Sequence, residues 1–306
     1  MPTISYSVHS LDHFSLIVPD LKQAFHFFDS FGLRVEQQHD CLGLYAADGH
    51  QWARVRAGSS KSLEYLSFNC DQAAFAPLSE QVKACNATIL DHGENFIWFK
   101  DPDGNLLQIK VGLKTIPDPS SACMAAKPTS IQGSAQVRSV GTRDQLPRIQ
   151  PVRLSHVLNF TPDVDRSIEF YSAALGLKLS DKSEDIIAFM HAPFGCDHHL
   201  IAFAKSTAKG WHHCAWEVPS VDDVGIGAFQ MAQAGYTDGW GTGRHSLGSN
   251  YFHYVRDPWG SFCEYSAEMD FIAEGVTWPS GDFAPENSLY LWGPDVPDYF
   301  IFNTEA

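Results

Sequence analysis

The sequence predicts an α+β protein made of two tandem, related modules, and three observations lead to this prediction. Several sequence blocks recur in the same order in the two halves of the 306 residues. Each half also carries an Asp-Pro-x-Gly turn between two apolar stretches, which is typical of a β-hairpin. Hydrophobic residues make up 44% of the chain and charged residues 19%, so both halves have the material for a globular core.

The first recurring block predicts a strand carrying a histidine, a Pro-Asp turn and an amphipathic helix. It reads LDHFSLIVPDLKQAFHFFDSFGLRV at 11–35 and LSHVLNFTPDVDRSIEFYSAALGLKLS at 154–180. In the second copy the apolar residues follow helical spacing. Asp163 suits the N-cap of that helix, and Gly176 suits a left-handed C-cap.

The remaining blocks predict strands, a helix and hairpins. SLEYLSFNC (62–70) parallels WHHCAWEV (211–218), and a helical stretch follows the latter at about 221–235. NFIWFKDPDGNLLQIKV (95–111) parallels NYFHYVRDPWGSFCEYSA (250–267). Each half is therefore expected to contain two helix-plus-strand units whose strands curl around a common cavity.

Composition places the boundaries of these modules. Residues 1–111 and 151–306 are the two predicted domains. Residues 112–150, with Pro117, Pro119, Pro128 and Pro147, have no sustained apolar period and predict a linker. The tail from about 272 to 306 is rich in aromatic residues and proline, which predicts an irregular segment packed over the second domain.

Charge and sorting signals narrow the range of partners. The formal net charge of −15 disfavours nucleic acid, because an acidic chain repels phosphate. No apolar run is long enough to cross a bilayer, and the N-terminus lacks the pattern of a secretion signal, so we expect a cytoplasmic protein without membrane contacts. The cysteines are odd in number and lack CxxC spacing, which favours reduced thiols over disulfides or structural zinc. They are Cys41, Cys70, Cys85, Cys123, Cys196, Cys214 and Cys263.

Alignment of the halves reveals where their polar chemistry differs. The aligned sets are His13, Tyr65 and Gln108 in the first half, and His156, His213 and Glu264 in the second. Two imidazoles and one carboxylate form a facial set for a divalent metal, with positions left for substrate and O2. The first half has a tyrosine and an amide in place of one imidazole and the anion, so we expect it to hold no metal.

Each ligand also has a structural interpretation. A single histidine on a strand is more often a hydrogen-bonded core residue than a ligand. Glu264, however, lies in an otherwise apolar run and would be costly to bury unless it were paired or metal-bound. On strands that a repeat brings side by side, the three residues together favour a metal site.

At these motifs the chain resembles the type I extradiol ring-cleavage dioxygenases of the vicinal oxygen chelate superfamily. The resemblance runs from residue 11 to at least 270, and its most specific part is GRHSLGSNYFHYVRDPWGSFCEY (243–265). It implies paired βαβββ modules, the glyoxalase-like fold, with the active site inside the second module. WHHCAWEV resembles the ligand strand of the family, in which the second histidine binds the metal, so His213 is chosen over His212.

The resemblance also implies roles for residues around the metal. His199 resembles the acid/base that protonates bound oxygen, although the adjacent His198 competes for this role. His245, expected in a glycine-rich loop, resembles the histidine near the substrate oxygens. Tyr254 resembles the hydrogen-bond donor to the deprotonated substrate hydroxyl. We expect three further polar side chains to line the substrate pocket, namely His198, Asn250 and His253.

The implied activity is insertion of both atoms of O2 into a catecholic ring beside its vicinal hydroxyls, giving a muconic semialdehyde-type product. The implied cofactor is Fe(II), with Mn(II) as the alternative, and relatives are usually homo-oligomers. Relatives specific for aromatic acids have an arginine shortly before the Gly-Arg-His motif. This chain has Asp238-Gly239-Trp240 there, which favours a neutral or apolar catechol, monocyclic or biaryl.

Three other functions share this scaffold. A glyoxalase-like isomerase or lyase draws its ligands from two modules and needs two carboxylates, whereas one module holds all the candidate ligands here. A 4-hydroxyphenylpyruvate dioxygenase-like enzyme would be longer and have Gly- and Phe-rich C-terminal motifs. A non-catalytic small-molecule binding protein would not need His199, His245 and Tyr254 around a complete ligand set.

Overall fold

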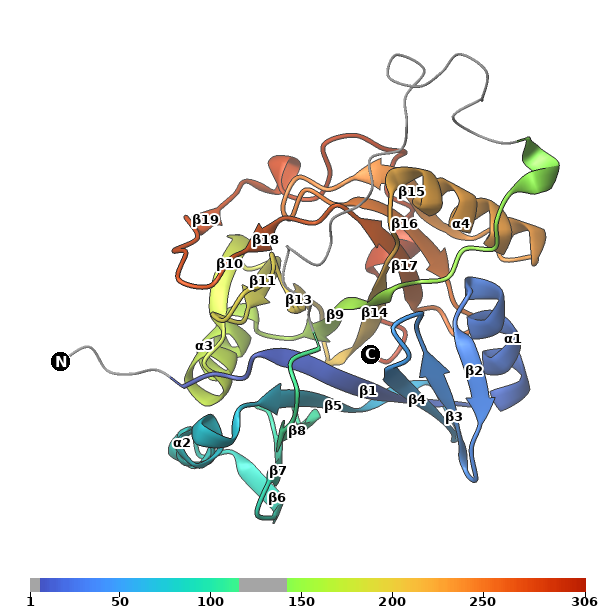
Figure 1. Cartoon of the computed structure of the whole chain (residues 1–306). Helices are drawn as coiled ribbons and strands as arrows, with labels where there is room; N and C mark the ends of the chain where they lie inside the picture. Colours follow the sequence, from blue (N-terminus) through green and yellow to red (C-terminus); the bar gives the residue numbers. More distant parts are fainter. Residues whose placement is uncertain (1–5, 116–141) are drawn as a thin grey trace, which may run out of the picture.

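The computed structural model, which describes residues 6–115 and 142–306, contains two large mixed sheets, one in each half of the chain (Figure 1). The first sheet has eight strands in the order β2-β3-β4-β1-β5-β8-β7-β6. Helices α1 (Leu21–Phe31) and α2 (Gln72–Ala84) accompany it. Its strands are β1 (Ser10–Val18), β2 (Arg34–Gln37), β3 (Cys41–Tyr45), β4 (Gln51–Ala57), β5 (Ser62–Cys70), β6 (Thr88–His92), β7 (Phe96–Lys100) and β8 (Leu106–Val111).

The second sheet has nine strands in the order β15-β16-β17-β14-β9-β13-β11-β10-β19. Helices α3 (Val164–Leu175) and α4 (Val221–Gln233) belong to this half. Its strands are β9 (Arg153–Thr161), β10 (Lys178–Ser183), β11 (Ile187–His191), β13 (Ile201–Lys205), β14 (Gly210–Glu217), β15 (Gly239–Arg244), β16 (Tyr251–Arg256), β17 (Phe262–Ala267) and β19 (Gly281–Asp282). A separate two-stranded sheet pairs β12 (Cys196–Asp197) with β18 (Phe271–Ile272).

The two sheets share one pattern of strand pairing. In the first module (β1–β8), β1 pairs antiparallel with β5 and parallel with β4, while β5 pairs parallel with β8. In the second module (β9–β19), β9 pairs in the same way with β14 and β13, and β14 pairs parallel with β17. The order β1-α1-β2-β3-β4 recurs as β5-α2-β6-β7-β8. This confirms the predicted α+β class built from paired βαβββ units.

The ends of the repeated helices are where their sequences place them. Asp163 caps α3 by accepting a hydrogen bond from the Arg166 N–H at 3.0 Å, and Gly176 closes the helix with a left-handed φ of 74°. Asp20 and Gly32 play the same parts in α1. Such caps satisfy helix-end groups that otherwise lack partners, so the recurrence of both signals follows from local chemistry.

The glycine-rich loop predicted around His245 begins later than expected. Its first residues, Gly243 and Arg244, end the edge strand β15, which pairs antiparallel with β16. The pairing is irregular between Gly241 and Gly243, and glycine accommodates such a bulge because it has no Cβ. The glycine-rich composition of this segment does not indicate a strand, yet the strand continues to Arg244 and the turn begins at His245.

Two smaller boundaries differ as well. Helix α4 ends at Gln233, and Gly235, with φ of 93°, lies just beyond its C-cap Ala234. His198 and His199 do not open a strand but lie in the connection between β12 and β13.

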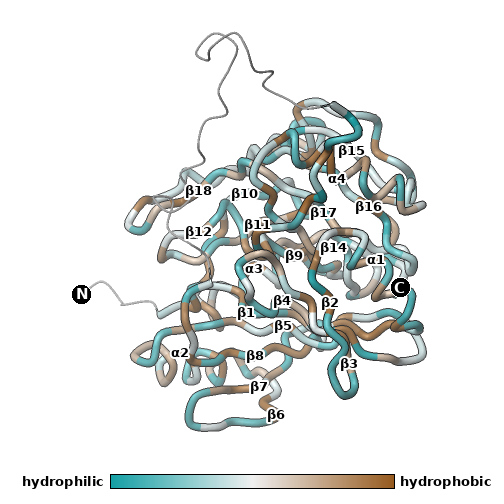
Figure 2. The backbone as a smooth tube through the Cα atoms, turned by 45° about the vertical axis from the view of Figure 1, so that its right-hand side comes forward, coloured by the Kyte–Doolittle hydropathy of each residue, from teal (hydrophilic) through white to brown (hydrophobic). Residues whose placement is uncertain are grey.

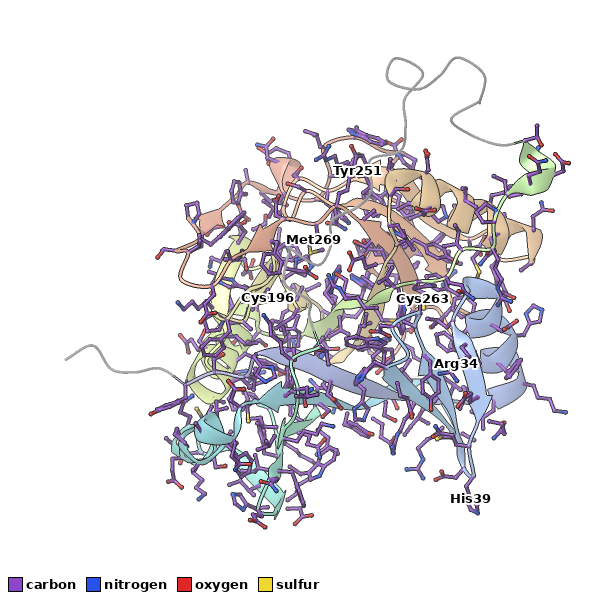
Figure 3. All side chains as sticks on the ribbon, in the orientation of Figure 1. Arg34, His39, Cys196, Tyr251, Cys263 and Met269 are labelled. Atoms are coloured by element: carbon purple, nitrogen blue, oxygen red, sulfur yellow. The ribbon has the colours of Figure 1, made fainter. Side chains whose placement is uncertain are left out.

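One apolar core joins the two modules. Helix α1 contacts α4, and α2 contacts α3. The ring of Phe31 stacks on that of Tyr265 with centroids 3.9 Å apart, and the Tyr265 hydroxyl donates to the Phe31 carbonyl at 2.7 Å. Apolar stretches are concentrated along the strands, whereas the peripheral loops are mostly hydrophilic (Figure 2). Cys263, on β17, is buried in this core (Figure 3).

The structure describes the whole C-terminal tail but only part of the proposed linker. Beyond β17 the tail contains β18, β19 and the short 3-10 helices η3 (Pro285–Asn287) and η4 (Asp298–Ile301), with irregular backbone between them. In the proposed linker, Pro117, Pro119, Cys123 and Pro128 lie outside the described residues, whereas Arg143–Gln145 forms the 3-10 helix η2. The six cysteines in the described ranges are free thiols. In those ranges, no helix is both long and apolar enough to cross a membrane.

Candidate metal centre

The three ligand candidates lie on adjacent strands at the centre of the second sheet. Ala215 on β14 pairs with His156 on β9 and with Glu264 on β17, and His213 precedes Ala215 by two residues. Because side chains alternate along a strand, His213 points to the same face as its neighbours. One ligand atom from each of the three residues lies within 4.8 Å of the others. Glu264 Oε2 is 3.3 Å from His156 Nε2 and 3.6 Å from His213 Nε2.

The donor atoms meet the requirements of a metal ion. Glu264 Oε2 and His213 Nε2 are buried and have no hydrogen-bond partner among the described residues. Buried polar atoms of this kind cost free energy unless something else binds them. Two imidazoles and one carboxylate suit a borderline divalent ion, and their position on one face leaves other coordination positions open.

Glu264 is oriented by a neighbouring amide. The Nδ2 of Asn250 donates to Glu264 Oε1 at 3.0 Å and also to the Ser266 hydroxyl at 2.9 Å. One carboxylate oxygen is therefore held by hydrogen bonding, and the other is free to bind a metal. Asn250 also lines the cavity described below, as expected from the sequence.

His245 and Tyr254 form a pair beside the candidate ligands. His245 Nδ1 is 2.6 Å from the Leu289 carbonyl, which can only accept, so this nitrogen carries the proton. His245 Nε2 then accepts from the Tyr254 hydroxyl at 2.9 Å. Burial lowers the pKa of His245, while burial and the nearby Glu264 raise the pKa of Tyr254 well above its usual value. Tyr254 therefore keeps its proton at neutral pH.

The structure distinguishes the adjacent histidines His198 and His199. The His199 ring lies 4.1 Å from the His156 ring and lines the cavity. His198 is fully buried behind it, with Nε2 2.7 Å from Asp181 Oδ2 and Nδ1 3.1 Å from His199 Nδ1. Burial lowers the pKa of His199 well below its usual value, and the neighbouring His156 lowers it further. A neutral His199 can accept a proton.

Two residues expected in the substrate pocket lie outside its lining. His198 is behind His199, and His253 points to the opposite side of β16 from Phe252 and Tyr254 because strand side chains alternate. His253 Nδ1 is 3.5 Å from the Thr242 hydroxyl, and burial lowers its pKa to about 4. We therefore place neither residue in contact with substrate.

A cavity of about 380 Å³ lies over the candidate ligands and is mostly apolar. Its polar side chains gather at the ligand end, except for Lys205 and Ser288. Among the described residues that line the cavity, Lys205 is the one with a permanent positive charge. Its Nζ forms an ion pair with Asp185 Oδ2 at 3.2 Å. The apolar wall consists of Leu158, Phe160, Ile186, Ile187, Phe189, Ala204, Leu247, Pro285, Leu289, Phe300 and Ile301.

Four of those wall residues come from the tail, namely Pro285, Leu289, Phe300 and Ile301. Composition indicated that the tail packs over the second module, but not which side chains enter the cavity. The same holds for Phe189 and Leu247, which no motif singled out. Asp181 was also missed, because an isolated aspartate has no recognisable pattern in the sequence.

The first module has hydrogen bonds at the positions where the second has ligand candidates. Ser67 on β5 pairs with both His13 and Gln108, as Ala215 pairs with His156 and Glu264. His13 Nε2 is 2.9 Å from the Tyr65 hydroxyl, and Gln108 Oε1 accepts from the Ser67 hydroxyl at 2.8 Å. The aligned positions are therefore structurally equivalent, but their side chains are partnered within the protein.

Comparison with known proteins agrees with this geometry. The family model described as Glyoxalase/Bleomycin resistance protein/Dioxygenase superfamily matches residues 153–265. The fold resembles the Mn(II)-bound glyoxalase from Novosphingobium aromaticivorans with a TM-score of 0.75 at 22% identity, covering 96% of this chain and 94% of that one. At this identity the match concerns the fold alone.

Curated relatives define the class more closely. The chain is 26% identical to biphenyl-2,3-diol 1,2-dioxygenase of Metapseudomonas furukawaii, over 85% of this chain and 86% of the relative. Its match to metapyrocatechase 2 of Cupriavidus necator is much stronger, at 56% identity over 306 residues, 98% of this chain and 94% of that protein. The chain therefore belongs to the extradiol dioxygenases of this superfamily, a family of metal-dependent ring-cleavage enzymes.

Proposed function

We propose that this dioxygenase cleaves an uncharged, apolar-substituted catechol with Fe(II) held by His156, His213 and Glu264. The observation that carries the proposal is the position of three ligand atoms, within 4.8 Å of one another, at the polar end of an otherwise apolar cavity. The names of the curated relatives, a metapyrocatechase and a biphenyl-diol dioxygenase, support a catecholic substrate.

The donor set supports Fe(II) as the resident metal. Two histidines and one carboxylate on one face are the ligands typical of non-haem Fe(II) oxygenases. Bound there, the ion would lower the pKa of a coordinated hydroxyl and supply the redox chemistry that O2 activation requires. Mn(II) is the alternative ion, because the same ligands accommodate it.

The protein residues supply orientation and proton transfer. Tyr254 keeps its proton and donates it to His245 Nε2 in this structure. With substrate bound, it would turn this proton towards the substrate oxygen that has lost one. His199 is neutral and buried, so it can accept the proton of a catechol hydroxyl and return it at a later step. His245, held by the Leu289 carbonyl, keeps Tyr254 in position.

The cavity wall favours substrates without a carboxylate. A catechol ring and an apolar substituent would lie against Leu158, Phe189 and Leu247, where a charge would lose its hydration without gaining a partner. The positive charge of Lys205, at the far side of the cavity lining from the ligand candidates, is already partly balanced by its ion pair with Asp185. We therefore expect alkyl- or aryl-catechols to react and protocatechuate to react poorly.

The test is anaerobic reconstitution with Fe(II), followed by catechol, 3-methylcatechol, 2,3-dihydroxybiphenyl or protocatechuate and then air. The proposal predicts O2 uptake and a yellow ring-opened product from the uncharged catechols. Equal or better turnover of protocatechuate would overturn the substrate assignment. Absence of product from all four, together with turnover of a glutathione hemithioacetal, would instead support a glyoxalase-type reaction.

A further inference from the structure

The last residues of the chain are anchored across the start of β14, the strand that carries His213. Asn303 Nδ2 donates to the Ala208 and Lys209 carbonyls at 3.0 and 3.1 Å. Glu305 Oε1 accepts from the Trp211 N–H at 3.1 Å. The C-terminus lies between the two modules, near β14 (Figure 1). The segment 300–306 therefore has fixed polar contacts to a strand of the candidate metal centre.

A buried lysine from the first module secures this segment. Lys61 Nζ is 2.7 Å from Glu305 Oε1 and donates to the Trp211 carbonyl at 3.0 Å and to the Ser261 hydroxyl. Its side chain is 4% exposed. An ammonium group has three protons, and these three acceptors use all of them. If the tail moved away, Glu305 would leave the buried charge of Lys61 without a partner, which costs free energy. The ion pair therefore holds the segment in place.

The anchored segment contacts His212, the residue before the ligand candidate. His212 Nε2 is 2.8 Å from the Phe300 carbonyl. Because a carbonyl oxygen can only accept, His212 Nε2 carries the proton. In a neutral ring His212 Nδ1 is then an acceptor. It lies 2.6 Å from His213 Nδ1, so His213 Nδ1 must be the donor.

That assignment decides the state of the other His213 nitrogen. A neutral His213 with its proton on Nδ1 has an unprotonated Nε2. This is the buried atom that lies 3.6 Å from Glu264 Oε2 and has no hydrogen-bond partner in the described part of the chain. With the opposite tautomer of His212, two lone pairs would face each other at the Phe300 carbonyl, and His213 would carry a proton on the nitrogen needed for the metal.

We propose that the Phe300 carbonyl, acting through His212, fixes His213 in the tautomer whose Nε2 lone pair is free for the metal. His212 is thus a positioning residue, and the C-terminal segment is part of the metal centre. The inference rests on the metal site within the proposed function, but not on the substrate or on turnover. Partners of this kind typically change metal affinity by roughly 10- to 100-fold.

A matched pair of variants at position 212 tests the relay. Glutamine places an amide donor where it can reach the Phe300 carbonyl, whereas leucine offers no polar atom. We expect His212→Leu to weaken binding of Co(II) to the full-length, metal-free protein by roughly 10- to 100-fold, and His212→Gln to retain most of the affinity. His253→Leu, which changes a histidine outside the cavity, should have no effect. Titration calorimetry without catechol or O2 measures these affinities.

Nitrogen NMR of the metal-free protein gives a direct readout of the tautomers. The proposal predicts a protonated Nδ1 and an unprotonated Nε2 for His213, and a protonated Nε2 for His212. A protonated Nε2 on His213, or unchanged Co(II) affinity in His212→Leu, would overturn it. Failure of ring cleavage with intact Co(II) binding would count against the proposed substrate and leave this inference standing.

The anchor is tested separately through its charge pair. Glu305→Gln removes the negative charge that pairs with Lys61 Nζ but keeps an oxygen that can accept from the Trp211 N–H. We expect a several-fold loss of Co(II) affinity and faster cleavage of the tail by carboxypeptidase. Faster cleavage with unchanged Co(II) affinity would show that the tail does not reach the metal centre, which would overturn its part in the proposal.

Discussion

At the scale of single residues, the two modules differ most at three equivalent strand positions. His213 and Glu264 leave unpartnered atoms beside His156, whereas Tyr65 and Gln108 are hydrogen-bonded within the first module. Replacement of the only carboxylate in the triad removes the anion that a divalent ion requires. Removal of the equivalent amide in the first module removes only a hydrogen bond.

Metal stoichiometry of two alanine variants tests this difference. We expect Glu264→Ala to lose stoichiometric iron binding and Gln108→Ala to retain about one iron per chain. Anaerobic loading followed by iron analysis measures both. Equal loss in the two variants would mean that the metal centre lies elsewhere.

Asp181 provides a second residue-scale prediction. It accepts from His198 Nε2 at 2.7 Å and from the Gly281 N–H at 2.8 Å. His198 Nδ1 then accepts from His199 Nδ1, which leaves His199 Nε2 unprotonated. We expect Asp181→Ala to lower kcat by roughly 10- to 100-fold, a part of the usual contribution of a general acid–base group. The affinity for Fe(II) should stay unchanged, because Asp181 touches no ligand candidate.

The control for Asp181 is a nearby aspartate that lacks this contact. Asp185 is exposed and pairs with Lys205 at the cavity rim, so Asp185→Ala should leave kcat for uncharged catechols within about twofold. Steady-state kinetics compares the two variants. A loss of iron from Asp181→Ala would reassign Asp181 to support of the metal centre.

At the scale of elements, the glycines that end the repeated helices also set how closely neighbouring segments approach. A Cβ on Gly176 would lie 2.2 Å from the Tyr6 carbonyl oxygen, and one on Gly32 would lie 2.0 Å from that of Ile149. Both residues also have positive φ values, 74° and 102°. The contacts involve backbone atoms, which cannot rotate away as a side chain can.

A comparison of two glycine-to-alanine variants isolates this packing effect. Gly235 has a φ of 93°, but a Cβ added there would have no neighbour within 4 Å among the described residues. Gly235→Ala should therefore cost only about 1 kcal/mol for its backbone conformation. Gly176→Ala has the same conformational cost plus the clash, and we expect at least twice the loss in free energy of unfolding. Urea denaturation of the full chain measures both, and equal losses would show that the Tyr6 segment moves aside easily.

Local signals explain which elements could be predicted from the sequence. Asp163, Gly176 and the Asp-Pro-x-Gly turns act within a few residues, and the structure has the expected caps and hairpins there. Gly243 and Arg244, expected in the loop of His245, belong to strand β15 because pairing with β16, rather than their own residue types, makes this segment a strand. Propensity in strands depends strongly on such context.

At the scale of the whole molecule, the repeat explains why the ligand candidates could be identified from the sequence and the cavity could not. His156, His213 and Glu264 occupy positions that recur in both modules, so alignment alone brings them together. Phe300 and Leu289 reach the cavity from a tail without a counterpart in the first module. His253, expected in the substrate pocket, lies outside the cavity lining because one step along β16 reverses the direction of a side chain.

Burial of histidines also gives the whole molecule a defined response to acid. Burial lowers the pKa of His191, His212 and His253 to about 4, from an ordinary value of 6.5. The unfolded chain therefore binds more protons than the folded protein between these values. By linkage, this contribution to stability is complete above pH 6.5 and is lost as the pH falls towards 4.

We therefore expect the metal-free protein to lose on the order of 1 kcal/mol of unfolding free energy per buried histidine between pH 7 and pH 5.5. Urea denaturation at both pH values measures the loss. His191, which bonds to the Ser180 hydroxyl and lies outside the cavity lining, is the residue to vary. In His191→Leu the pH-dependent loss should shrink by about one histidine's share, because a leucine takes up no proton in either state. An unchanged loss in this variant, or stability that rises towards pH 5.5, would contradict the proton balance derived from burial.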